Sequence, residues 1–511
     1  MLQILKAHRR LMIQAAIFAA FPLVCAVLYC LKDGHTINDI YLPVSYWNDE
    51  LIYYKQVEAV VNCGLPQGWF GFQEAHANVY PFAAWSPTIL IPWVVWGKLF
   101  GWNLLSPVYA NIVYSMASMG LFAVLVKPSV KQSVFLLGLT AAFMPYTRYL
   151  LCGMPESLFL AAGIVFAALT VSYIREERRW KLVLLFLLSV LVTIARPYLG
   201  LLFLIPVWFA VRKSRWKGLL FSCVIIAGTA GAYVLVTRLC CAPYLESIVK
   251  ASWLGIFFTD GPVAGIRYVF DTLLDRFTAL YRDHLKPAVK FGLFSGSLYG
   301  VVGLTALILL IRFLWAWRKG KDKDMRILAL FQFLMTAGMV LAVFLFYKMG
   351  EGSKHLMLFI LMSLVWIALT DEKYCLMKGA AAFLCLYFFV IKAFIPYDWQ
   401  AAYDAVGMRE EARLLEAQLD ANMERSAPEG FSEPEEYRYA NTVIWLASDI
   451  IEGESIPATW GLLYMIPEGY GINFCTQVYA LEHFDELRSG YIAVLPGGQV
   501  EERILQAGGQ G

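Results

Sequence analysis

Two adjacent carboxylates, Asp49 and Glu50, follow the first long apolar segment of this chain. Charge beside a lipid bilayer is energetically costly, so an ionisable pair at this place is a candidate for chemistry. A carboxylate at a membrane surface can accept the proton of a hydroxyl group as that group attacks a substrate. The alternative is structural, because Asn48 would cap a helix whose first turn favours acids through the helix dipole. Adjacent helical residues also point about 100° apart, so the two carboxylates need not face one site.

Further candidate binding residues stand near the ends of other apolar segments. The cations among them are Arg148, Arg196, Lys348, Lys354 and His355. Each could instead be an interfacial side chain that reaches the lipid headgroups. Glu156 begins an apolar segment, where it is either a second acid of the site or a partner of a helix dipole. His76 is either a binding residue or a simple loop residue.

Composition assigns the chain to the membrane proteins. Its residues are 59% apolar and 16% charged, and the mean hydropathy is +0.59, whereas soluble domains are about 45–50% apolar and about 25% charged. A formal net charge of +3 over 511 residues gives no basic field for nucleic acid. The composition therefore predicts an integral membrane protein whose partners include the bilayer and no nucleic acid.

Apolar runs of the length that crosses a bilayer, about 20 residues, recur through the first 396 residues. They are Leu11–Leu31, Ser106–Val126, Ser133–Leu151, Ser157–Ile174, Leu219–Val236, Leu293–Leu314, Ile327–Phe346, Leu356–Leu369 and Leu376–Ile395. Two shorter runs, Leu182–Ala195 and Leu199–Val211, meet at Arg196 and Pro197, and they form either two short spans or a re-entrant hairpin. Counting them as spans predicts an all-α polytopic protein with about eleven transmembrane helices.

Basic residues fall in alternate connections between these runs, which sets the expected topology. Examples are Arg9 and Arg10, Lys127 and Lys131, Arg212 and Lys213, and Lys373 and Lys378. By the positive-inside rule this face is cytoplasmic. We therefore expect a multi-pass protein of the cell membrane with a cytoplasmic N-terminus, a retained first span and an extracytoplasmic C-terminal part.

The outer face is expected to hold three larger pieces. The first loop, 32–105, contains a helix over Leu51–Asn62 and an interfacial helix over Trp85–Phe100. The second, from Cys240 to Lys290, contains an amphipathic interfacial helix over Ile266–Tyr281. The third, 397–511, is a small α/β domain, distinct from the transmembrane domain 1–396. Its expected elements are the helix Val406–Met423, the strands Thr442–Leu446, Leu462–Ile466 and Tyr491–Leu495, and the helix Val478–Arg488.

An ordered series in the first loop resembles the polytopic glycosyltransferases of the C superfamily, which include protein O-mannosyltransferases and bacterial lipid-A aminoarabinose transferases. The series runs from Asp49-Glu50-Leu51-Ile52-Tyr53-Tyr54 through Asn62-Cys63-Gly64 and Trp85-Ser86-Pro87 to Lys98-Leu99-Phe100-Gly101. Met154-Pro155-Glu156-Ser157 and Ala195-Arg196-Pro197 extend the resemblance over roughly the first 400 residues. Ser86 departs from it, because many members have a second proline there.

The resemblance implies an enzyme that moves a sugar from a polyprenyl-phosphate carrier to an acceptor at the outer face. Asp49 corresponds to the family's catalytic acid, with Glu50 beside it. The segment Gly350-Glu351-Gly352-Ser353-Lys354-His355 resembles the family's basic site, so Lys354 is the favoured ligand of the donor phosphate, with His355, Arg196 or Arg148 near it. Glu156 and His76 complete the expected site. The implied acceptor is a glycan, a lipid or a protein of the cell envelope.

The sequence predicts no cofactor, although it leaves dependence on a divalent metal open. The ten cysteines show no CxxC and no Cys/His spacing suited to zinc. Two alternative functions remain. A membrane transporter or lipid-linked-sugar flippase would be favoured by internal repeats, helices broken at mid-membrane and paired intramembrane charges. A non-catalytic member of the same fold would keep the first-loop series without the activity.

Overall fold

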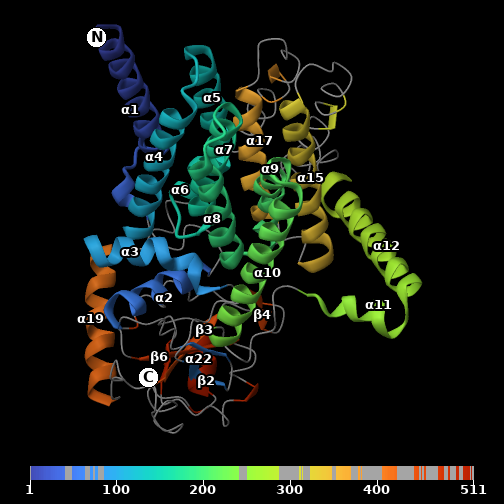
Figure 1. The fold of residues 1–511 in the computed structure, drawn as a ribbon. Coiled ribbons are helices and arrows are strands. Elements are labelled where there is room, and N and C mark those ends of the chain that lie inside the picture. The colour runs from blue at the N-terminus through green and yellow to red at the C-terminus, as the bar shows by residue number, and fades with distance from the viewer. Residues whose placement is uncertain are drawn as a thin grey trace.

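The structure is a computed structural model that describes residues 2–40, 49–63, 70–72, 75–78, 86–240, 250–286, 323–347, 353–369 and 405–422, with short segments at 310–311, 314, 378–379 and 381. Near the C-terminus it describes 442–447, 450–451, 454–455, 466, 470–476, 482–483, 491–493, 499–506 and 508. A layer of long helices stands above a small sheet, and α1 begins at the end of the helices far from that sheet (Figure 1).

Five helices within the described ranges are long and apolar enough to cross a membrane. They are α1 (Leu2–Leu31), α4 (Ser106–Val126), α7 (Glu156–Arg175), α10 (Arg215–Cys240) and α15 (Lys323–Phe346). Each contains one of the apolar runs predicted to span. The runs Leu293–Leu314 and Leu376–Ile395 lie almost entirely outside the described residues, so the total of about eleven spans stays a prediction.

The apolar run Ser133–Leu151 was predicted as one continuous span, and this prediction is wrong. The structure divides it into α5 (Val130–Ala142) and α6 (Met144–Leu150), with Phe143 non-helical between them. Pro145 explains the break, because proline has no N–H to donate to the preceding turn and its ring disfavours the helical conformation of the residue before it.

The paired short runs form a helical hairpin that is interrupted at Arg196. Helix α8 (Arg179–Ala195) ends there, the 3-10 helix η3 (Pro197–Phe203) follows, and α9 (Leu204–Lys213) continues the chain. The Arg196 backbone is extended, as expected for a residue that precedes proline. The interruption leaves the guanidinium of Arg196 at the junction of two helices, where it can turn toward other elements.

Helix α17 (Met357–Ala368), preceded by the 3-10 helix η6 (Ser353–Leu356), lies in the centre of the helical layer. All its residues are buried, as expected for a helix that is apolar on every face. It packs against α7, where Gly163 permits a close approach: a Cβ built there would lie 2.1 Å from Leu358 Cδ1. Helix α7 also packs against α4, and α4 packs against α1.

The first outer loop forms two helices that lie across the ends of the long helices, on the side of the sheet (Figure 1). The expected helices are found as α2 (Asp49–Cys63) and as η2 (Pro87–Leu90) with α3 (Ile91–Phe100). The Trp102 indole N–H donates to the Tyr54 carbonyl over 3.0 Å, and the Lys98 ammonium donates to the Val61 carbonyl. These bonds join the two helices of the loop.

The sheet has five strands in the order β2-β1-β6-β3-β7. Strands β1 (Phe70–Phe72) and β2 (Ala75–Asn78) belong to the first outer loop, while β3 (Thr442–Ala447), β6 (Gly471–Thr476) and β7 (Tyr491–Ala493) lie near the C-terminus. Strand β1 is parallel to β6 and pairs Phe70 with Ile472. The sheet therefore includes residues from outside the predicted domain 397–511.

The remaining C-terminal elements are α19 (Ala405–Asn422), α22 (Gln499–Gln506) and a two-stranded sheet of β4 (Ile450–Ile451) and β5 (Glu454–Ser455). The predicted strands at 442–446 and 491–495 correspond to β3 and β7. The predicted strand Leu462–Ile466 and helix Val478–Arg488 lie mostly outside the described residues. A separate C-terminal α/β domain therefore stays a prediction.

The second outer loop contains the expected amphipathic helix as α12 (Pro262–Ala279), which continues into a π-helical turn at Leu280–Leu285. It follows η4 (Ser252–Gly255) and α11 (Ile256–Thr259). Phe277 packs edge-on against Phe344 of α15, with ring centroids 5.1 Å apart. The helix therefore lies beside a candidate span (Figure 1).

Candidate active site

The short connection between α6 and α7 positions Glu156, the first residue of α7. The Asn111 side-chain amide on α4 donates to the Cys152 carbonyl over 2.8 Å. The Trp93 indole N–H donates to Asn111 Oδ1 over 3.0 Å. The Gly153 N–H donates to Glu50 Oε2 over 2.9 Å. Contacts from α2, α3 and α4 thus fix the connection that leads into Glu156.

Glu156 forms a buried ion pair with Arg196. Arg196 Nη1 lies 2.7 Å from Glu156 Oε1, and the two side chains are only 1% and 4% exposed, respectively. The guanidinium carbon also lies 4.7 Å from the centroid of the Phe159 ring, a cation–π contact. Because an unpaired charge would be very costly at this depth, each partner depends on the other.

His355 and Tyr198 complete this cluster. His355 Nδ1 lies 2.8 Å from Arg196 Nη1 and 2.7 Å from the Tyr198 hydroxyl, while the Arg196 guanidinium donates to that hydroxyl over 3.0 Å. Burial lowers the pKa of His355 well below its usual range, and the charges of Arg196 and Lys354 act in the same direction. His355 is therefore a neutral imidazole at neutral pH.

Asp49 and Lys354 form the second ion pair of the site. Lys354 Nζ lies 3.1 Å from Asp49 Oδ2, and the lysine side chain is 6% exposed whereas the aspartate side chain is 40% exposed. Lys354 lies in η6, directly before His355, so the two ion pairs are adjacent. Asp49 is the charged group of the site that solvent reaches most readily.

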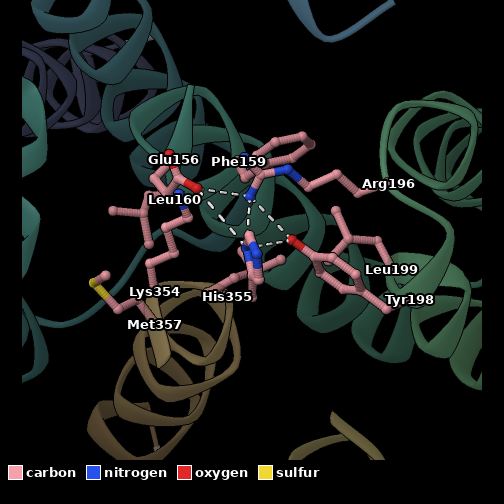
Figure 2. A pocket seen from close by; sticks show the side chains of 10 residues that line it. Glu156, Phe159, Leu160, Arg196, Tyr198, Leu199, Lys354, His355 and Met357 are labelled. Atoms are coloured by element: carbon pink, nitrogen blue, oxygen red, sulfur yellow. Dashed lines mark hydrogen bonds and ion pairs between the residues drawn. The ribbon is translucent and has the colours of Figure 1, made fainter. Parts of the chain in front are cut away.

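A pocket lies beside the Glu156–Arg196 pair and Lys354, and Figure 2 shows the side chains that line it. Its lining includes Glu156, Arg196, Tyr198, Lys354, His355 and the apolar Met357 and Leu358. Charged and apolar side chains therefore meet around one small space.

The structure brings together five of the residues that the sequence singled out: Asp49, Lys354, His355, Arg196 and Glu156. Glu50 is 1% exposed and accepts the hydrogen bond from Gly153, so its carboxylate points toward the connection before α7. Arg148 lies on α6 and hydrogen-bonds the Tyr29 phenol of α1. His76 lies on β2 in the sheet. Lys348 lies outside the described residues.

Sequence reasoning missed Tyr198 and Asn111. The signal for Tyr198 was its place two residues after Arg196, whose guanidinium donates to the Tyr198 hydroxyl. Asn111 carried a weaker signal, a lone amide in an apolar span, which needs a buried partner. Within the ranges described, no group of three or more His, Cys, Asp or Glu side chains is arranged to hold a metal ion.

Comparison with known proteins gives one structural likeness. No protein-family model matches the sequence, and no curated protein matches it either. The chain is similar to the crystal structure of the Archaeoglobus fulgidus oligosaccharyltransferase in the apo form, with a TM-score of 0.47 and 10% sequence identity. The likeness covers 95% of this chain and 69% of that chain. At this TM-score and identity it assigns neither a residue role nor a substrate.

Proposed function

We propose that this protein is an integral membrane glycosyltransferase that moves a hexose or pentose from a polyprenyl-phosphate carrier to an acceptor at the outer face of the membrane. The observation that carries the proposal is the pair of a partly exposed carboxylate, Asp49, and a buried ammonium, Lys354, 3.1 Å apart. A proton acceptor and a cation side by side are the two groups that such a transfer requires. The first-loop series supports the same assignment.

In the proposed reaction, a hydroxyl oxygen of the acceptor attacks the anomeric carbon of the sugar. The bond between that carbon and the phosphate oxygen breaks, and its electron pair leaves with the polyprenyl phosphate. The Asp49 carboxylate takes the proton of the attacking hydroxyl. The Lys354 ammonium stabilises the negative charge that develops on the departing phosphate, where a poorly hydrated site makes this attraction strong.

The charges of the site are balanced before substrate binds. Lys354 pairs with Asp49, Arg196 pairs with Glu156, and His355 is neutral. In the proposed binding step, the donor phosphate takes over the Lys354 ammonium, which leaves Asp49 available to the acceptor. Arg196, His355 and Tyr198 form the wall of the phosphate pocket, and Glu156 holds Arg196 in place.

The proposed location of the reaction follows from the positions of the charged groups. Glu156 begins α7 and Arg175 ends it, and Arg175 donates to the Val126 carbonyl at the last residue of α4. The basic turns therefore lie at the end of the helices opposite the candidate site. With the positive-inside rule, this arrangement supports our proposal that the site faces the extracytoplasmic side, where the proposed acceptor is a glycan, a lipid or a protein of the envelope.

A lipid-linked-sugar flippase is the second candidate, because the buried Glu156–Arg196 pair is the kind of paired charge that such transporters contain. The two candidates differ in their products. A transferase releases free polyprenyl phosphate, whereas a flippase moves the intact donor across the bilayer.

The test uses the full-length protein in lipid nanodiscs with a panel of polyprenyl-phosphate hexoses and pentoses, and an envelope extract as acceptor. We expect sugar-dependent release of polyprenyl phosphate by the wild type and not by Asp49→Asn. A parallel proteoliposome assay measures the movement of a fluorescent lipid-linked sugar between leaflets. If the lipid-linked sugar moves between leaflets while no donor of the panel releases polyprenyl phosphate, the flippase is favoured and the transferase is contradicted.

A further inference from the structure

Helix α2 contains a buried lysine that takes no part in the proposed chemistry. Lys55 is 7% exposed, although it lies only two turns after Asp49. Its ammonium donates to Glu58 Oε2 over 2.7 Å and to the Ile466 carbonyl over 2.6 Å. A buried charge needs such partners, because a lone ammonium would be strongly destabilising at this depth. Lys55 therefore ties α2 to a segment that is 411 residues away in the chain.

Ile466, the residue that Lys55 contacts, lies in the C-terminal part. Ile466 is fully buried, and Tyr470 donates its hydroxyl to Asp420 of α19 over 2.6 Å. Strand β6 starts at the next residue, Gly471, and pairs in parallel with β1, which follows α2 in the chain. Helix α2 is thus connected to the C-terminal part by the Lys55 side chain and, beyond its C-terminal end, by the sheet.

The other tie of α2 runs to the helical layer. Glu50 accepts the Gly153 N–H in the connection that leads into Glu156. Between Glu50 and Val57 every side chain of α2 is buried, so this half of the helix is enclosed on all sides. Asp49 stands at the end of this enclosed stretch, about 9 Å along the helix axis from Lys55. A shift or rotation of α2 would move its carboxylate relative to Lys354.

We propose that Lys55 is a positioning residue through which the C-terminal part holds α2 in the place that sets Asp49 against Lys354. This inference rests on the proposed function, in which Asp49 is the base. The C-terminal part thereby has a role in the reaction, although the described contacts of the Asp49–Lys354 and Glu156–Arg196 pairs come from elements outside it. Because a misplacement of about 1 Å can lower turnover about 10²-fold, loosening this tie should lower the rate of transfer.

The expected kinetic signature separates positioning from substrate binding. In Lys55→Met the aliphatic stem remains and the ammonium is lost. We expect kcat to fall about 10- to 100-fold, while the KM for the donor stays within about twofold because Lys354, Arg196 and His355 lie on other elements. Lys55→Arg keeps a cation that can reach the Ile466 carbonyl, so it should restore a large part of kcat.

The matched control is Lys98→Met. Lys98 also donates to a carbonyl of α2, that of Val61, but it does so from α3 and near the far end of the helix. We expect kcat close to that of the wild type for this variant. An equal loss of kcat in Lys98→Met and Lys55→Met would show general loosening of α2 and overturn the specific role of Lys55.

A second measurement does not depend on activity. Hydrogen exchange of the full-length protein in nanodiscs is followed for peptides that cover residues 49–54 and, as a reference, residues of α17. We expect faster exchange at 49–54 in Lys55→Met, restoration in Lys55→Arg, and no change in α17. Unchanged exchange at 49–54, or exchange raised equally in α17 as in a globally destabilised protein, would overturn the inference. If the wild type transfers no sugar, the proposed function fails, while the exchange result still decides whether Lys55 holds α2.

Discussion

The Asp49 carboxylate lies 3.1 Å from the Lys354 ammonium, although 305 residues separate the two in the chain. Asp49 opens α2 of the first outer loop, and Lys354 lies in the 3-10 turn before α17. Because the lysine is buried and the aspartate is partly exposed, a substrate that arrives from solvent meets the carboxylate first. The pair therefore joins the first outer loop to the core helix beside the proposed phosphate pocket.

Replacing Asp49 by Asn should abolish most of the activity. The change keeps the side-chain volume but removes the proton acceptor, so turnover of a polyprenyl-phosphate sugar should fall by about 10²- to 10⁴-fold while the protein remains folded. Initial rates of polyprenyl-phosphate release, together with the thermal midpoint in detergent, measure both effects. Transfer at the wild-type rate by Asp49→Asn would rule out the assignment of this residue as the base.

The control for this experiment is Glu50→Gln. Glu50 is buried and accepts the Gly153 N–H, a bond that the Gln carbonyl oxygen can also accept. Its replacement should therefore lower turnover less than Asp49→Asn does. A larger loss in Glu50→Gln than in Asp49→Asn would reverse the roles of the two carboxylates.

Lys354 should be required for binding or turnover of the donor. Lys354→Gln removes the cation, so donor affinity, turnover or both should fall, whereas a lysine that only reaches lipid headgroups could be replaced with little effect. Lys354→Arg retains charge but exchanges a compact ammonium for a planar fork. Partial activity of Lys354→Arg would indicate a point-charge role, and full loss would indicate a tightly shaped pocket. If Lys354→Gln and the wild type show the same donor affinity and turnover, the donor phosphate binds at another site.

The Glu156–Arg196 pair should contribute to stability chiefly through the cost of breaking it. Glu156→Gln leaves a buried guanidinium without its carboxylate, and removing one partner of a buried pair costs about 3–5 kcal/mol. The double variant Glu156→Gln/Arg196→Met removes both charges and should recover part of that loss. Thermal unfolding in nanodiscs measures the series. Additive destabilisation in the double variant would show that the two residues act independently.

Stability should fall in mild acid because His355 is buried as the neutral imidazole. Its pKa is lowered by burial and by the charges of Arg196 and Lys354, while Glu156 at 3.8 Å opposes them. The unfolded chain binds a proton near the ordinary value of 6.5 and the folded protein does so only at lower pH. The stabilisation is thus complete above about pH 6.5 and is lost as the pH falls from there toward the folded pKa.

The variant that checks this pH dependence is His355→Asn. Its thermal midpoint should fall less between about pH 7.5 and pH 5.5 than that of the wild type. Tyr198 and Tyr347, which contact the ring, remain neutral throughout this range by their chemistry as phenols. Parallel curves for the two proteins would mean that another group governs the acid lability.

The helices could be predicted from sequence because their signals are local. Apolar length marked α1, α4, α7, α10 and α15, and the motifs marked both members of the Asp49–Lys354 pair. The pairing itself could not be derived, because no spacing rule connects residues 305 positions apart. Resemblance supplied the candidates, and only the three-dimensional structure shows that the first residue of α2 reaches the lysine of η6.

The errors and omissions have physical causes. The run Ser133–Leu151 is uniformly apolar, so hydropathy hid the break that Pro145 imposes. Strand β1 has only three residues, and its partner β6 lies about 400 positions later, so neither length nor alternation indicated their pairing. The hydrogen bond from Lys55 to the Ile466 carbonyl could not be predicted either. A lysine in a loop between membrane spans is ordinarily solvated, so nothing in the sequence indicated its burial.

The expected topology can be tested with engineered cysteines. Because basic turns alternate regularly along the chain, an impermeant maleimide added to intact cells should label Gln73→Cys in the first outer loop and Gln418→Cys on α19. It should label Lys321→Cys, in a predicted cytoplasmic turn, only after the membrane is permeabilised. A background in which all ten native cysteines are replaced keeps the signal specific. The prediction matters for function because polyprenyl-phosphate sugars would have to be used outside, on the face of Asp49. Labelling of Lys321→Cys in intact cells at the rate of Gln418→Cys would place both on one face and contradict the alternation.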